Sequence, residues 1–265
     1  MKAAKRLLAV LIVAAAALAG LVVLRDRGPD HILLSGATAR PLEGTPGAVA
    51  VFVTIENAGK PDRIVGASSP DAAAAVLVAP SADTGLPIPA GGRPSLAADG
   101  AYLKLTGITG DLGDGRLIPV TLKFAEAGAV TTRARLADPQ AQGNAASVGL
   151  FGLGDICVVG GDTGEPAPAI SLNVQADGDG WTVQVVTEQF SFTEDLVDGP
   201  HIPGTGHGHL YVGGVKLQRL YDPVARIGAL PPGTHEVQVT LNTNDHRAYV
   251  VGETPVTASA TIEVR

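Results

Sequence analysis

The chain has 265 residues, of which 45% are hydrophobic and 4% aromatic, so a core of Val, Leu, Ile and Ala is expected. Its formal charge is −7, and no run of basic residues follows the first six positions, which argues against a nucleic-acid partner. The 34 glycines and 19 prolines suit a protein with many turns, and they are too few for a disordered low-complexity chain.

The first 24 residues have the pattern of an export signal. Lys2, Lys5 and Arg6 precede an uninterrupted apolar run, Leu7 to Leu24, whose length is at the lower limit for a membrane span. Small residues around Ala19 suit a signal peptidase, but the apolar run continues beyond them. A cleaved signal peptide and a retained inner-membrane anchor at residues 7–24 both stay open. Either one places the rest of the chain in the periplasm or outside the cell.

Residues 25–36 contain turn formers and are predicted to be a tether, so that the first domain covers residues 37–136. Apolar side chains fall on alternate positions from Val49 to Ile55, which is the period of a half-buried strand. Further strands with turn residues between them are predicted at residues 63–67, 75–78, 102–106 and 118–124.

The alternating pattern stops over residues 137–169, which we interpret as a linker with one apolar piece, and it resumes in a second domain over residues 170–265. Apolar and polar residues alternate there after Trp181, from His235 to Leu241 and from Val256 to Val264. Short strands without a long helical pattern predict an all-β protein made of two β-sandwich or barrel domains.

The first domain carries a set of short segments in a fixed order. They are Ala37–Pro41, Val51–Asn57 with Gly59, Asp62–Arg63, Gly66–Pro70, Ile88–Gly92 and Gly115–Phe124. In this order they resemble the PCu(A)C domain of periplasmic copper chaperones. The resemblance implies a cupredoxin-like β-domain outside the cytoplasm.

Copper in that family is bound by histidines and methionines near the ends of two strands. The corresponding positions here are Val78 and Pro80 for the first histidine and methionine, and Tyr102 and Lys104 for the later pair. Apolar and cationic side chains cannot replace thioethers at a Cu(I) site. The resemblance therefore implies the fold and the compartment without the ligands.

Two segments of the second domain, Gly206–Val212 and Asn242–Arg247, resemble the tail domain that accompanies some of these chaperone-like proteins. The Asp-His pair before a strand is also similar to the small copper-resistance sandwich proteins of the periplasm.

Histidines are concentrated in the second domain, because residues 201–246 hold five of the six in the chain. His207 and His209 share one face of a predicted strand, and the glycine-rich loop before them allows His201 to fold back. Asp245 and His246 follow in a polar loop. We predict a metal site formed by His207, His209 and His246 first, and by His201 and Asp245 second. The alternative is that these groups cap the loop and bond its backbone.

The predicted ligands are nitrogen and oxygen atoms, since Met1 is the one methionine and Cys157 the one cysteine. Such a set favours Cu(II) over Cu(I), with zinc as an alternative. Cys157 is expected to be a small buried apolar residue, with a reactive thiol or an extra copper ligand as the alternatives. His235 shares the apolar face of its strand and is expected to be buried and hydrogen-bonded.

No nucleophile elbow, phosphate-binding glycine loop or His-Glu-x-x-His pattern occurs, so we predict a protein that is not an enzyme. The sequence favours an extracytoplasmic copper-binding or copper-trafficking protein, with a metal-recipient envelope protein as its partner. The alternative is a metal-free envelope interaction module with structural histidines.

Overall fold

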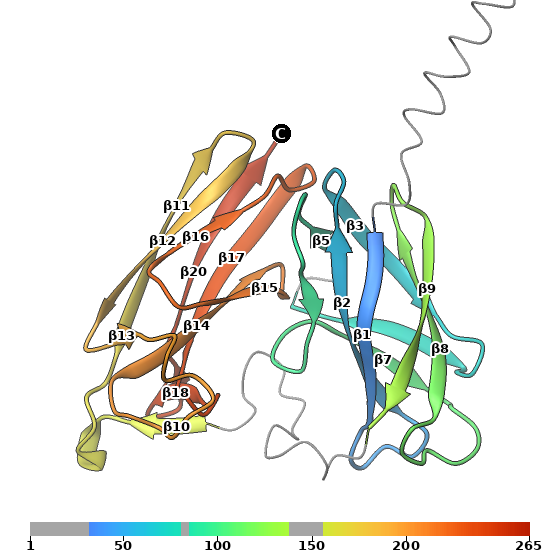
Figure 1. The fold of residues 1–265 in the computed structure, drawn as a ribbon, viewed down its shortest axis with the longest axis horizontal. Helices are drawn as coiled ribbons and strands as arrows, with labels where there is room; N and C mark the ends of the chain where they lie inside the picture. Colours follow the sequence, from blue (N-terminus) through green and yellow to red (C-terminus); the bar gives the residue numbers. More distant parts are fainter. Residues whose placement is uncertain (1–31, 81–84, 138–155) are drawn as a thin grey trace, which may run out of the picture. The chain divides into compact units, whose positions relative to one another are not determined.

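The structure is a computed structural model that describes residues 32–80, 85–137 and 156–265 (Figure 1). These residues form strands, turns and one short 3₁₀ turn, Gly161–Thr163, without an α-helix among them. The predicted all-β class with two domains is confirmed. The predicted export or anchor segment, residues 7–24, lies outside the described residues. Within the described part of the chain, no helix has the length and apolar character needed to cross a membrane.

The described residues of the N-terminal domain form nine strands. They are β1 (Ile32–Pro41), β2 (Val49–Asn57), β3 (Asp62–Ser68), β4 (Ala74–Val78), β5 (Leu86–Ile88), β6 (Ser95–Leu96), β7 (Tyr102–Thr106), β8 (Leu117–Phe124) and β9 (Ala129–Leu136).

Strand β1 connects the two halves of this domain, because it pairs antiparallel with β2 and parallel with β9. On one side β2 continues to β6 and β7, and β7 pairs with β4. On the other side β9 pairs with β8, β8 with β3, and β3 with β5. The alternate residues of β2 from Val49 to Ile55 are at most 3% exposed, so the predicted inward face of this strand is the core face.

Strand β1 begins inside the segment that was predicted to be a tether. Ile32 and Leu34 are buried while Leu33 is 59% exposed, which is the alternation of a strand. The register then shifts between Ser35 and Thr38, around Gly36 at φ 60°. This bulge interrupts the two-residue period in the sequence.

The C-terminal domain contains the remaining strands. They are β10 (Ile156–Val159), β11 (Ala169–Asp177), β12 (Gly180–Glu188), β13 (Ser191–Phe192), β14 (Thr205–Val212), β15 (Val215–Leu220), β16 (Val224–Ile227), β17 (Gly233–Asn242), β18 (Ala248–Val251), β19 (Thr254–Pro255) and β20 (Thr257–Val264).

This domain has a main sheet in which β14 lies between β15 and β17, and β17 also pairs with β20. A second sheet has the order β11-β12-β16. Val183 and Val185 of β12 pack in one apolar cluster with residues of β14, β17 and β20, such as Leu210, Val239 and Ile262. The two sheets therefore share a core as in a β-sandwich.

Strand β10 falls in the segment that was predicted to be a linker. It pairs in parallel with β18, so that Cys157 lies opposite Tyr249. Both residues belong to a smaller apolar cluster with Phe190 and Leu241. The end of the expected linker is thus part of the domain.

Strand β14 approaches its neighbour β17 very closely at one residue. A Cβ atom built on Gly206 would lie 2.0 Å from the carbonyl oxygen of Asn242, whereas glycine leaves that space free. The neighbouring pair in the register is His207 opposite Asn242. Gly206 therefore sets the distance between the two strands at the point where His207 is held.

We expect Gly206→Ala to lower the free energy of unfolding by about 2 kcal/mol or more, because the added methyl group meets backbone and not a movable side chain. Urea denaturation measures the change. Gly66→Ala in β3 is the matched control, since nothing lies within 4 Å of its added Cβ, and a change of at most about 1 kcal/mol is expected there. Equal effects of the two substitutions would contradict this account of Gly206.

Candidate metal centre

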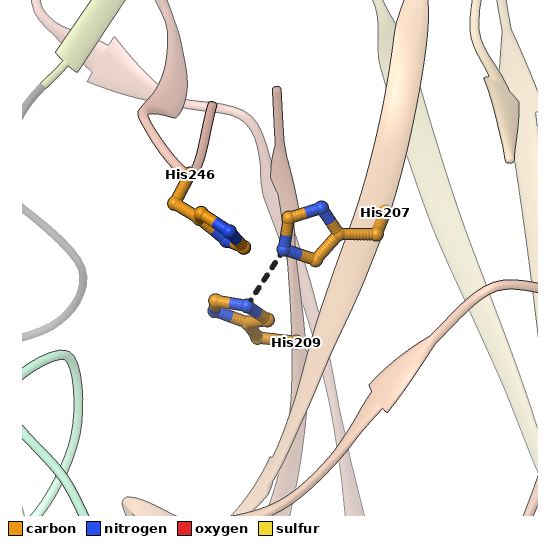
Figure 2. Close-up of side chains that lie close together, drawn as sticks. All are labelled: His207, His209 and His246. Atoms are coloured by element: carbon orange, nitrogen blue, oxygen red, sulfur yellow. Dashed lines mark hydrogen bonds between the residues drawn. The ribbon is translucent and has the colours of Figure 1, made fainter. Parts of the chain in front are cut away.

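Three imidazole rings of the C-terminal domain converge on one place (Figure 2). His207, His209 and His246 each offer one nitrogen, and these atoms lie within 4.8 Å of one another. The Nε2 atoms of His207 and His209 are 3.0 Å apart. The ring centre of His207 is 4.8 Å from that of His209 and 5.0 Å from that of His246. The three residues placed first in the predicted site are therefore brought together.

Two of these rings come from β14. His207 and His209 are two positions apart in a strand, so their side chains point to the same face, while Leu210 points to the sandwich core. Both rings are nonetheless buried, with exposures of 0% and 4%. Each must consequently satisfy its polar atoms within the protein.

The third ring comes from the turn between β17 and β18. Its backbone is closed by hydrogen bonds from the Thr243 amide to the Arg247 carbonyl and from the His246 amide to the Thr243 carbonyl. His246 has a φ of 67°, in the left-handed region that few residues other than glycine adopt. This conformation places its ring beside His207.

Two of the three rings are paired with a carboxylate. Asp99 Oδ2 is 2.7 Å from His209 Nδ1, and Asp198 Oδ1 pairs with His246 Nε2. A ring that donates one N–H to a carboxylate keeps its other nitrogen as an electron-pair donor, which is the usual arrangement of metal-binding histidines. His209 thus presents Nε2 toward His207, and His246 keeps Nδ1 as its donor atom.

His207 has no such support, because its buried Nδ1 atom has no hydrogen-bond partner. Its Nε2 atom faces the Nε2 atom of His209, and one of the two must carry the proton between them. Since Asp99 accepts the proton of His209 at Nδ1, His207 is the donor. A metal cation would replace this proton, so the donor atoms present fit a nitrogen-binding ion such as Cu(II) or Zn(II).

Burial keeps the two rings of β14 neutral. Desolvation first, and then the neighbouring histidines and cations, lower the pKa of His207 from 6.5 to about 2. Desolvation and the charge of Lys216 lower the pKa of His209 to about 4, although Asp99 opposes this shift. Neutral imidazole is the form that binds metal ions, so protons do not compete at neutral pH.

A lysine and a tyrosine complete the surroundings of His209. Lys216 Nζ is 3.1 Å from His209 Nδ1, and both Lys216 and the Tyr211 hydroxyl donate to Asp99. Burial would raise the pKa of Asp99, but its hydrogen bond with His209 and the charge of Lys216 hold that pKa well below its usual range. The Asp99 carboxylate therefore offsets the Lys216 ammonium, which on its own would repel a metal cation.

The other two predicted ligands lie elsewhere. His201 does not fold back to His207, because its Nε2 atom is held 2.9 Å from Glu165 and 3.8 Å from Cys157. Asp245 forms an ion pair with Arg247 and accepts a hydrogen bond from Thr243. The structure thus brings together three of the five predicted residues, all of them histidines.

The remaining histidine of the second domain, His235, is buried and hydrogen-bonded, as expected. His235 is 3% exposed, and its Nε2 atom donates to the carbonyl oxygen of Pro231 at 2.7 Å. Cys157 is also buried, at 5% exposure, as expected.

Sequence reasoning missed Asp99, Asp198 and Lys216. Lys216 and Asp99 are 117 positions apart, and His246 and Asp198 are 48 positions apart. No local motif marks either carboxylate. Their roles arise from chain segments that meet in the folded protein.

The positions that the resemblance assigns to copper ligands lie on two paired strands of the N-terminal domain. Val78 of β4 lies opposite Tyr102 of β7, and Val76 lies opposite Lys104. Neither of the groups of three metal-capable side chains found in the described residues belongs to this domain. The residues present at this place do not fit copper.

Residues 32–136 match the family described as "Putative lipoprotein LpqE-like". Similar solved structures include a copper-bound PCuAC domain from PmoF2, with 26% identity, a TM-score of 0.37, and coverage of 41% of this chain and 94% of that one. The Cu(I) form of DR1885 from Deinococcus radiodurans has 26% identity, a TM-score of 0.33, and coverage of 40% and 76%. Comparison with curated proteins gives no match. The expected resemblance of the N-terminal domain is confirmed.

The lowered pKa values predict how stability depends on pH. An unfolded histidine titrates near 6.5, whereas in the folded chain His207 has a pKa of about 2 and His209 of about 4. Below about pH 6.5 the unfolded state binds protons that the folded state excludes, so stability is lost as the pH falls, by about 1.4 kcal/mol per pH unit for each such ring.

We expect urea midpoints of the metal-free protein, measured with a chelator from about pH 6.5 to about pH 4.5, to fall more steeply for the wild type than for His207→Phe. The substitution removes one group that must charge on unfolding. Parallel slopes would show that His207 is not kept neutral by the fold.

Proposed function

We propose that this chain is an extracytoplasmic copper-binding protein of a chaperone-like type, which holds Cu(II) through His207, His209 and His246. The observation that carries the proposal is the convergence of three imidazoles, two of which, His209 and His246, are paired with a carboxylate. Carboxylates in this position fix the tautomer of a metal-binding histidine and raise its basicity.

The ligand types favour some metal ions over others. Three imidazoles without a thiolate or a thioether suit Cu(II) or Zn(II) better than Cu(I). Among divalent ions of the first transition series, Cu(II) binds such nitrogen sites most tightly. Copper is therefore the first choice and zinc the alternative.

The N-terminal domain supports the copper assignment through its relatives. Two similar solved structures are described as a copper-bound domain and as a Cu(I) form, and the matching family is described as a lipoprotein family. With the export pattern of residues 1–24, these descriptions favour a place outside the cytoplasm. We assign the domain a supporting role, such as contact with a metal-recipient envelope protein, and no catalytic step is part of the proposal.

One observation favours the alternative of a metal-free interaction module. His209 already contacts Asp99, Tyr211 and Lys216, so this ring has polar partners without an ion. In that reading the histidines are structural and their loss affects stability alone. Metal titration separates the two functions.

Titration of the metal-free full-length protein with Cu(II) is expected to show a tight equivalent whose electron paramagnetic resonance spectrum has nitrogen ligands and no sulfur ligand. His207→Ala combined with His209→Ala removes two of three ligands and should abolish this binding. His235→Gln is the control, because it changes a histidine that bonds Pro231 outside the group. Tight Cu(II) binding with this sulfur-free nitrogen spectrum that survives the double substitution in a folded protein would reject this site.

The carboxylate of Asp198 tests the support of His246 separately. We expect Asp198→Asn to weaken Cu(II) binding by about tenfold, since the ring loses a charged acceptor that orients it. Asp195→Asn, at an exposed position in the same loop, is the matched control and should leave the Kd for Cu(II) unchanged. Equal Kd values for the two variants would exclude a supporting role of Asp198.

A further inference from the structure

A second group of metal-capable side chains lies in the C-terminal domain, apart from the three histidines. Cys157, Glu165 and His201 each offer one atom, and these atoms lie within 4.8 Å of one another. The Nε2 atom of His201 is 3.8 Å from Cys157 Sγ and 3.0 and 2.9 Å from the two oxygens of Glu165. A sulfur, a nitrogen and a carboxylate thus converge.

Three different segments hold these residues. Cys157 belongs to β10, which is fixed by its parallel pairing with β18. The loop after β10 closes through a hydrogen bond from the Gly160 amide to the Glu165 carbonyl, and the Thr163 hydroxyl donates to Gly160. His201 precedes β14, and its ring lies 5.9 Å from the ring of Tyr249. Strand pairing and hydrogen bonds thus hold the backbone on which Cys157 and Glu165 lie.

The arrangement differs from a nucleophile, base and acid in series. In such a triad the cysteine and the acid bond opposite nitrogens of the histidine. Here Cys157 and Glu165 both contact the Nε2 atom of His201. The Nδ1 atom of His201 is buried without a hydrogen-bond partner. One ring nitrogen can give one proton, whereas a cation between the three groups would bind all of them.

We propose that Cys157, Glu165 and His201 form a second metal site, which takes a divalent ion of the zinc class. Thiolate, imidazole and carboxylate are the ligand types that zinc binds in proteins, and three protein ligands leave a fourth position for water or for a ligand from a partner. This site goes beyond the copper centre, shares no ligand with it and does not depend on it.

The surrounding charges suit a cation. Arg247 lies close enough to affect both Cys157 and Glu165, but its guanidinium is paired with Asp245 at 3.0 Å. Burial first, with Glu165 and Asp245, raises the pKa of the Cys157 thiol although Arg247 opposes this. The metal-free thiol is therefore protonated at neutral pH, and metal binding releases this proton to water.

Cobalt reports on the sulfur ligand directly, because a thiolate bound to Co²⁺ gives charge-transfer absorption in the near ultraviolet. We expect this absorption on adding Co²⁺ to the reduced, metal-free full-length protein, and its loss when Zn²⁺ displaces Co²⁺. It should persist in His207→Ala combined with His209→Ala, and disappear in Cys157→Ser. Glu165→Gln should raise the apparent Kd for Co²⁺ by about tenfold or more.

Alkylation of Cys157 in the unmodified sequence provides a second measurement that does not require a cysteine variant to fold. Zn²⁺ should slow the reaction by about tenfold or more, and this protection should be lost in His201→Ala. Absence of the sulfur absorption in the wild type, its retention in Cys157→Ser, or an alkylation rate that Zn²⁺ leaves unchanged would overturn the second site. Because the double histidine variant is tested in parallel, failure here is distinct from failure of the copper centre.

Discussion

The burial of two imidazole rings on one face of β14 is the constraint on which the rest of the C-terminal domain depends. His207 and His209 have almost no contact with water, so they must stay neutral and find partners inside the protein. Asp99 meets this need for His209, and the turn that carries His246 covers His207. The close approach of β14 to β17 at Gly206 fixes the backbone beneath them. The ring cluster thus results from the packing of strands and turns as well as from the contact between His209 and Asp99.

The sequence predicts what depends on local periodicity. The inward face of β2 and the common face of His207 and His209 follow from the two-residue repeat, and both agree with the structure. Strand β1 was missed because a bulge breaks the repeat, and His201 was misplaced because a glycine-rich loop permits many paths. Nothing local identifies Asp99 or Asp198, which join the site only through distant segments.

The N-terminal domain has the fold expected from the resemblance without the side chains that would bind copper. Its strands β4 and β7 bring together the positions that the resemblance assigns to copper ligands, and Val78 and Tyr102 face each other there. An apolar side chain and a phenol lack the imidazole nitrogen and thioether sulfur atoms that bind copper. The second domain, in contrast, offers donor atoms on a frame that the family match over residues 32–136 does not cover.

The left-handed backbone conformation of His246 bears on which residue is favoured at this position of the turn. A left-handed conformation at a residue with a side chain costs about 1 kcal/mol or more, which glycine would avoid. Without a use for the ring, the backbone of this turn gives no reason to prefer histidine to glycine. A histidine that persists among relatives at this position, in spite of the energetic disadvantage, would mark the turn as functional.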